Sequence, residues 1–271
     1  MSPAGVVLAA GAGTRLAPLT HLRPKALCPV GGRPLLDHAL DRLVAALPAA
    51  TADPPAHLAV NAHAHAGQVV RAVGGRAHVA VEAPVALGTA GALGGLRDWL
   101  DGRDVVVTNA DAWLPEGLDG LLDGWDGERC RLLVQELDDG PGDPVVRPAS
   151  RERPVRYVGA CVLPGRLVRA LAPVPSGLLE VLWRAERDAG RLDLHRTAQR
   201  GVDCGTPGRY LAANLAASGG RSVIGAGAVV DGELERCVVW DGAVVGAGEH
   251  LVDVVRAGDD RHRVTVGGSS S

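Results

Sequence analysis

The chain has 271 residues, 46% of them hydrophobic and 22% charged, which is enough to bury the core of a large globular domain. The net charge of −3 and the aromatic content of 3% argue against nucleic acid and anionic membranes as partners. Five widely spaced cysteines without a CxxC pair argue against a disulfide framework or a structural zinc site. The N-terminus lacks a basic region followed by a long apolar run, so we expect no signal peptide and a cytoplasmic protein.

The first predicted element is an apolar strand at Val6–Ala10 that leads into the sequence Gly11-Ala12-Gly13-Thr14. Small residues let backbone N–H groups approach an anion, and Arg15 and Lys25 add positive charge nearby. The segment therefore predicts a phosphate-binding loop. It is neither a Walker motif nor a dinucleotide motif, because no Gly-Lys-Ser/Thr follows and Leu16 replaces the third glycine.

Lys25 is the only lysine in the chain, which contains twenty-seven arginines. An ammonium is a compact point charge that the planar guanidinium of arginine does not reproduce, so its retention here favours a functional role. Chance in an arginine-preferring genome is the alternative.

Apolar spacing next predicts helices that alternate with strands, as in a parallel sheet covered by helices. These elements are a helix at Pro34–Leu47, a strand at His57–Val60, a helix at Gln68–Val73 and a strand at Ala77–Val81. The segment Leu87–Leu93 is rich in small residues that let a flat ring lie against the backbone, and Thr89 is expected to cap a helix running toward Trp99. A plain glycine-rich helix start is the alternative.

A strand at Asp104–Asn109 is expected to deliver Asp111 at the carboxyl edge of the sheet, where a carboxylate can hold magnesium. An Asx turn is the alternative for Asp111. Asp203 lies ninety-two positions further on, before Thr206, a predicted N-cap. The two carboxylates can hold one cation only if the fold brings them together.

The remaining predicted elements are a short helix at Glu116–Asp123, strands at Arg131–Glu136 and Arg156–Leu163, a mobile loop or hairpin at Asp138–Pro154 and a helix from Ser176 to Ala189. An apolar-Gly-Ala-Gly unit then occurs at Ile224 and again at Val245, twenty-one residues apart, which is typical of a coiled β repeat. The polar end of the chain is expected to be disordered.

Three motifs resemble those of sugar-1-phosphate nucleotidyltransferases: Gly11 to Leu36, Thr108-Asn109-Ala110-Asp111 and Asp203-Cys204-Gly205-Thr206-Pro207. Within that family the sequences of these motifs are most similar to those of mannose-1-phosphate guanylyltransferases and N-acetylmuramate-1-phosphate uridylyltransferases. The resemblance implies a reaction of a nucleoside triphosphate with a sugar 1-phosphate, in the presence of Mg²⁺. By resemblance, GTP and mannose 1-phosphate are the preferred substrates. The alternatives are UTP or dTTP with another sugar, or a non-catalytic nucleotide-sensing module.

The same resemblance implies the site residues. Arg15 and Lys25 would be catalytic, and Asp111 and Asp203 would bind the metal. The nucleotide would contact Leu8, Ala9, Ala10, Gly11, Ala12, Gly13, Thr14, Glu82, Gly88 and Thr89, and the sugar would contact Asn109, Gly159 and Glu180. For Glu180 the alternative is a solvated residue that favours the helix dipole. Many relatives have a second lysine for the sugar phosphate, and its candidate replacements here are Arg147, Arg151, Arg153 and Arg156.

The expected architecture is a Rossmann-like α/β fold, with a mixed, mostly parallel sheet and helices on both faces. It divides into a nucleotidyltransferase domain at 1–219, a short segment at 220–258 that resembles a left-handed β-helix, and a tail at 259–271. A repeat of this length is short for a free-standing solenoid, which favours packing on the main domain or self-association into a homo-oligomer.

Overall fold

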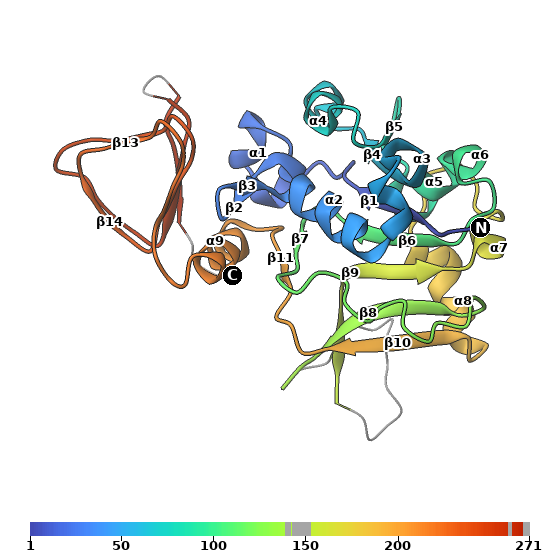
Figure 1. The fold of residues 1–271 in the computed structure, drawn as a ribbon. Coiled ribbons are helices and arrows are strands. Elements are labelled where there is room, and N and C mark those ends of the chain that lie inside the picture. Colours follow the sequence, from blue (N-terminus) through green and yellow to red (C-terminus); the bar gives the residue numbers. More distant parts are fainter. Residues whose placement is uncertain (139–141, 143–152, 260–261, 268–271) are drawn as a thin grey trace.

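The computed structural model describes residues 1–138, 142, 153–259 and 262–267. Its centre is a seven-stranded sheet of order β10-β8-β9-β6-β1-β4-β5 (Figure 1). The strands are β1 (Ala4–Leu8), β4 (Leu58–Ala62), β5 (His78–Val81), β6 (Val105–Asn109), β8 (Cys130–Glu136), β9 (Val155–Leu163) and β10 (Leu192–Thr197). Strand β9 is antiparallel to both β6 and β8, and every other neighbouring pair is parallel. The predicted mixed, mostly parallel sheet is confirmed.

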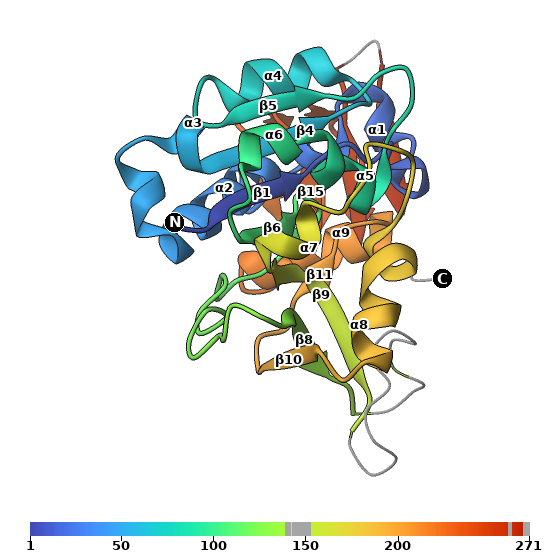
Figure 2. The ribbon, with the colours of Figure 1, turned by 90° about the vertical axis from the view of Figure 1, so that its right-hand side faces the viewer.

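Helices cover both faces of this sheet (Figure 2). Successive residues of a strand point to opposite faces, so Val7 packs in the cluster that contains α2 (Leu35–Ala46) and α4 (Ala66–Val73). Val6 packs in the other cluster, whose helices are α5 (Gly88–Gly95), α6 (Arg97–Leu100), α7 (Gly165–Val168) and the π-helical turn η4 (Leu179–Trp183). The turn η4 continues directly into α8 (Arg184–Asp188). The short helix α3 (Pro54–His57) and turn η3 (Pro48–Thr51) precede β4.

The region from Glu116 to Asp123 forms turns, so the helix predicted there is wrong. Gly117 and Gly120 have φ values of +68° and +71°, in the left-handed region that interrupts a right-handed helix. This segment connects β7 (Ala112–Trp113) to β8.

The predicted helix from Thr89 to Trp99 is interrupted, and its predicted cap is wrong. Helix α5 begins at Gly88 without a side-chain cap, and the hydroxyl of Thr89 accepts a hydrogen bond from Leu178 N at 2.8 Å. The helix ends at Gly95, and α6 starts at Arg97. Consecutive glycines at 94 and 95 have low helix propensity, which accounts for the break.

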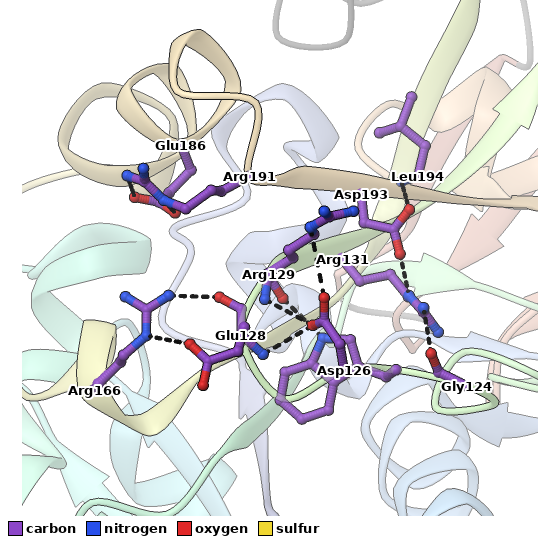
Figure 3. A network of polar contacts seen from close by, with 11 residues as sticks. Gly124, Asp126, Glu128, Arg129, Arg131, Arg166, Glu186, Arg191, Asp193 and Leu194 are labelled. Atoms are coloured by element: carbon purple, nitrogen blue, oxygen red, sulfur yellow. Dashed lines mark hydrogen bonds and ion pairs between the residues drawn. The ribbon is translucent and has the colours of Figure 1, made fainter.

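Strand β10 was not predicted from the sequence, and polar contacts hold it at the edge of the sheet (Figure 3). Arg131 on β8 donates through Nε to Asp193, its register partner on β10, at 2.6 Å. The same guanidinium donates to Asp123 O at 2.7 Å. Glu186 accepts two hydrogen bonds from Arg191, at 2.8 and 2.9 Å, across the turn between α8 and β10.

A coil of short parallel strands follows helix α9 (Pro207–Ala217), and in Figure 1 it forms a triangular unit beside α9. Its pairs are β12 (Val223–Ile224) with β15 (Val238–Val239), β15 with β18 (Val254–Ala257), β13 (Val229–Val230) with β16 (Val244–Val245), and β14 (Glu233–Glu235) with β17 (His250–Val252). A β-helix-like appendage is therefore present, as predicted. The final strand β19 (Val264–Gly267) pairs antiparallel with β18, so the prediction of a disordered tail is wrong for these residues.

The appendage packs against the N-terminal part of the chain. One buried cluster joins Leu19 and Val30 with Tyr210 of α9 and Trp240 of the coil. Trp240 Nε1 donates to Tyr210 Oη at 3.0 Å, and the Tyr210 hydroxyl donates to Pro29 O. Because the two parts share this core, the coil is held on the main domain. In the described part of the chain, no helix has the length and apolarity to cross a bilayer.

Candidate active site

The carboxyl ends of three parallel strands meet at one edge of the sheet. Leu8 of β1 is the register partner of both Asn61 on β4 and Asn109 on β6. A cavity of about 200 Å³ lies over these residues, and it is lined by Leu8, Ala10, Gly11, Asn61, Ala86, Gly88, Thr89, Asn109 and Asp111. Five of the predicted nucleotide contacts are therefore brought together here: Leu8, Ala10, Gly11, Gly88 and Thr89.

A second cavity of about 350 Å³ adjoins the first. It is lined by Arg15, Asn109, Asp111, Ala112, Arg156, Tyr157, Val158, Gly159, Gly201, Asp203 and Arg209. Asn109 and Asp111 line both cavities, so these side chains lie at the junction. A ligand that spanned both cavities would pass over Asp111.

The fold brings the two aspartates together. Asp203 lies on β11 (Val202–Asp203), opposite Ala112 of β7, and Cys204 N donates to Asp111 O at 2.9 Å. Lys25 lies between the two carboxylates. Its Nζ is 2.6 Å from Asp111 Oδ2 and 3.5 Å from Asp203 Oδ1, and the lysine is only 7% exposed.

Gly13 allows Lys25 to approach the loop. Its φ is +64°, and a Cβ built there would lie 2.8 Å from Thr20 Cγ2 and 3.1 Å from Lys25 Cβ. Thr20 Oγ1 also donates to Gly13 O at 3.1 Å. The loop begins after β1 and contains the helical turn η1 (Thr14–Leu16), with α1 (Leu19–Leu22), η2 (Lys25–Leu27), β2 (Pro29–Val30) and β3 (Arg33–Pro34) following it. A larger residue at position 13 would press against the side chains of Thr20 and Lys25.

Glu82 is buried and connects the loop to the base of α5. Its Oε1 accepts from Asn61 Nδ2 and its Oε2 accepts from Leu87 N, both at 2.7 Å. Asn61 Oδ1 in turn accepts from Ala9 N at 2.7 Å. These bonds tie three segments that line the first cavity. Glu82 itself lines neither cavity, and its contact with nucleotide stays a prediction.

Gly159 allows strand β9 to pass close to the junction. Its φ is +91°, and an added Cβ would lie 2.9 Å from Ala112 Cβ and 3.4 Å from Asn109 Cβ. On the same strand, Arg156 lines the second cavity and donates to Gln135 Oε1 at 3.2 Å. Arg153 lines a different cavity and lies 3.9 Å from Glu136. Arg147 and Arg151 lie outside the described residues.

Some predicted contacts line neither of the two cavities. Glu180 is one of them, and its role stays a prediction, as do those of Ala9, Ala12, Gly13 and Thr14.

Sequence reasoning missed Asn61 and Arg209 as lining residues. Arg209 lies 3.3 Å from Asp203 Oδ2 and donates its backbone N–H to the N-cap hydroxyl of Thr206 at 3.4 Å. Its place in the first turn after a predicted cap was the available signal.

The carboxylate oxygens of Asp111 and Asp203 suit a hard divalent cation. Asp111 and Asp203 direct carboxylate oxygens to one cation, the Lys25 ammonium, and these side chains are 36% and 42% exposed. Oxygen ligands of this kind suit Mg²⁺, which commonly uses one or two carboxylates together with substrate phosphates. Burial raises the pKa of the neighbouring Cys204 thiol, and Asp111 raises it further, so the thiol stays neutral. Across the described ranges, no cluster of three His, Cys, Asp or Glu side chains fits a metal.

Comparisons with known proteins identify the family to which this chain belongs. A model of the nucleotidyl transferase family matches residues 4–127. N-acetylmuramate alpha-1-phosphate uridylyltransferase of Caulobacter vibrioides is 34% identical over 209 residues, which cover 69% of this chain and 85% of that protein. Glucose-1-phosphate thymidylyltransferase of Streptomyces antibioticus is 32% identical over 145 residues, covering 51% of this chain and 39% of that protein.

Solved structures show the same fold. A Thermus thermophilus protein named mannose-1-phosphate geranyltransferase superposes with a TM-score of 0.71 at 18% identity, covering 99% of this chain and 96% of its own. An Acinetobacter baumanii UDP-glucose pyrophosphorylase has a TM-score of 0.59 at 16% identity, covering 80% and 93%. From the family match and the extent of the uridylyltransferase alignment, we conclude that this chain belongs to the nucleotidyl transferase family of enzymes.

Proposed function

We propose that the protein joins a nucleoside triphosphate to a sugar 1-phosphate and releases pyrophosphate. One observation carries the proposal: two cavities meet at Asp111, where Lys25 and Asp203 also converge. A sugar phosphate in the larger cavity and a nucleotide in the smaller one would place the attacking oxygen beside the α-phosphorus. Catalysis of this kind depends mainly on positioning and charge neutralisation.

In this reaction the phosphate oxygen of the sugar 1-phosphate attacks the α-phosphorus while pyrophosphate leaves. The attacking phosphate is already ionised, so no general base is needed. Lys25 steadies the α-phosphate, and Arg15, whose side chain is 69% exposed, binds the departing phosphates. Backbone N–H groups of the loop from Gly11 to Thr14 assist in phosphate binding.

Asp111 and Asp203 are the proposed ligands of Mg²⁺. The ion would neutralise phosphate charge and orient the reacting groups when bound. Arg156 and Arg209, which both line the larger cavity, are our candidates for the cation that many relatives provide with a second lysine. The bidentate geometry of a guanidinium suits a phosphate dianion.

UTP and N-acetylmuramate 1-phosphate are the first substrate pair to test, because the Caulobacter relative with that named activity aligns over 85% of its length. GTP and mannose 1-phosphate are the second pair, favoured by the segment Leu87–Leu93, whose Gly88 and Thr89 line the smaller cavity. A sensing module of the same fold is disfavoured because Arg15, Lys25 and both aspartates are all present.

The test is pyrophosphate release with Mg²⁺ across five nucleoside triphosphates and a panel of sugar 1-phosphates. We expect turnover with one nucleotide and sugar pair, and its loss in Asp111→Asn. Nucleotide binding without turnover on any sugar phosphate would contradict the proposed transferase activity and favour the sensing module.

We also propose a cytoplasmic homo-oligomer that associates through the appendage. Ile224 is 54% exposed although its register partner Val239 is 1% exposed, so the first turn of the coil leaves an apolar residue open. Among the described residues, strands β12, β13 and β14 each have a paired neighbour on one side only. Light scattering of wild type and Ile224→Asp checks this. Val81→Asp, at an exposed valine on β5, is the control, and an unchanged mass in Ile224→Asp would contradict the proposal.

A further inference from the structure

A buried arginine lies beneath the junction of the two cavities. Helix α2 presents Ala39, Leu40 and Leu43 to the core, and Arg42 is buried on the same helix with only 5% exposure. Burial lowers the pKa of this guanidinium to about 10, and Asp111 acts in the opposite direction, so Arg42 is charged at neutral pH. Its Nε has no hydrogen-bond partner among the described residues. Burying a charged guanidinium in an apolar core costs folding free energy. We therefore expect Arg42 to have a role that compensates for this cost.

The two terminal nitrogens of Arg42 hold the turn that carries Asp111. Nη2 donates to Asn109 O at 3.2 Å, at the end of β6, and Nη1 donates to Ala112 O at 2.8 Å, at the start of β7. Main-chain bonds secure the residues between these two carbonyls. Ala110 N donates to Leu8 O and Asp111 O accepts from Cys204 N, each at 2.9 Å. Arg42 therefore connects the two strand ends on either side of the aspartate.

We propose that Arg42 is a positioning residue for the metal-binding carboxylate of Asp111. It lines neither substrate cavity and acts only through the turn from Asn109 to Ala112. This inference rests on the proposed function, because it assigns Asp111 to the metal.

The positioning role predicts an effect that a purely structural role does not. Loss of a group that orients a metal ligand commonly lowers metal affinity or activity by about 10- to 100-fold. A residue that only fills the core would lower the melting temperature and leave metal affinity intact in the folded protein. The affinity of the folded protein for Mn²⁺, measured by electron paramagnetic resonance without nucleotide, separates the two.

The experiment compares wild type, Arg42→Lys, Arg42→Met and a matched control, Arg256→Met. Arg256 is also buried, at 3% exposure, but it lies in the appendage, where it donates to Val244 O at 3.0 Å and to Glu249 at 2.6 Å. We expect Arg42→Met to lose about 10- to 100-fold in Mn²⁺ affinity and in kcat. Arg42→Lys keeps a donor and should fall between. Arg256→Met should lose stability but keep the wild-type Mn²⁺ affinity and kcat.

Two outcomes would overturn the proposal. A folded Arg42→Met with wild-type Mn²⁺ affinity and kcat would show that Arg42 is structural only. If Arg42→Met does not fold, wild-type affinity in Arg42→Lys decides the matter in the same way. Equal Mn²⁺ affinity in wild type and Asp111→Asn, both without and with nucleotide, would instead remove the metal role of Asp111 and the positioning role with it.

Discussion

Replacing Lys25 by methionine should have opposite effects on catalysis and on metal binding. In the structure its ammonium lies 2.6 Å from Asp111 and 3.5 Å from Asp203, where it neutralises the two carboxylates that would bind the metal. A divalent cation and this ammonium therefore compete for the same oxygens. In the proposed reaction, bound nucleotide would offer Lys25 its α-phosphate as a new partner and would free the carboxylates. We expect metal and nucleotide to bind cooperatively for this reason.

The magnitudes follow from the distances and the exposure. Each ion pair has a Coulomb attraction of roughly 5 kcal/mol at an effective dielectric constant of about 20. The Lys25 side chain is 8% exposed, but its partners are 36% and 42% exposed, so solvent screening and desolvation offset most of this attraction. Lys25→Met should cost about 1–2 kcal/mol of unfolding free energy. Loss of a cation that stabilises charge in the transition state should lower kcat by about 10²- to 10³-fold.

Metal affinity should change in the other direction. Without the competing ammonium, the free Lys25→Met protein should bind Mn²⁺ at least about tenfold more tightly, which corresponds to about 1.4 kcal/mol. Lys25→Arg separates charge from shape, because it keeps a competing cation but replaces the compact point charge by a planar guanidinium. It should keep weak Mn²⁺ binding and still lose most of kcat.

Three assays check these expectations: pyrophosphate release for kcat, electron paramagnetic resonance for Mn²⁺, and thermal unfolding for stability. Wild-type turnover in Lys25→Met would refute the catalytic role. Unchanged or weaker Mn²⁺ binding in that variant would refute the competition between ammonium and metal. Because Lys25 is the only lysine, amine methylation located by mass spectrometry offers a second check, and nucleotide should protect it.

Three further predictions concern other parts of the site and core. Asp111→Asn and Asp203→Asn should each lower kcat at least about 100-fold with little change in melting temperature; wild-type turnover in either would argue against metal ligation. Gly159→Ala should lose about 1–3 kcal/mol of stability, from its φ of +91° and a clash with Ala112, and should raise KM for the sugar phosphate more than for the nucleotide; an unchanged KM ratio would place the sugar elsewhere. Burial raises the pKa of Cys28 from 9.0 to about 12. The neutral thiol therefore stabilises the folded state fully below pH 9, and this stabilisation is lost as the pH rises toward 12. The melting temperature of Cys28→Ala should fall less at alkaline pH than that of the wild type.

Local patterns in the sequence determined most of the elements around the site. The apolar run before Gly11, the helix opened after Pro34 and the Thr206-Pro207 start of α9 depend on neighbouring residues, so they were predictable. The sequence also shows glycines at positions 13 and 159. The structure gives the reason for them, because a positive φ and close packing leave no room for a larger residue there. The resemblance of the motifs assigned the reaction class, which the comparisons support.

Only the tertiary structure decided which distant groups meet. Lys25 lies 86 positions from Asp111 and 178 from Asp203, and Arg42 lies 67 and 70 positions from the two carbonyls that it binds. Such contacts arise from strand order and register, which no short stretch of sequence encodes. The same holds for β10 and β19, whose partners β8 and β18 are chosen by packing and pairing in the folded chain. Local sequence thus determines which residues the site contains. Folding brings these residues together because β7 and β11 pair beside the end of β1.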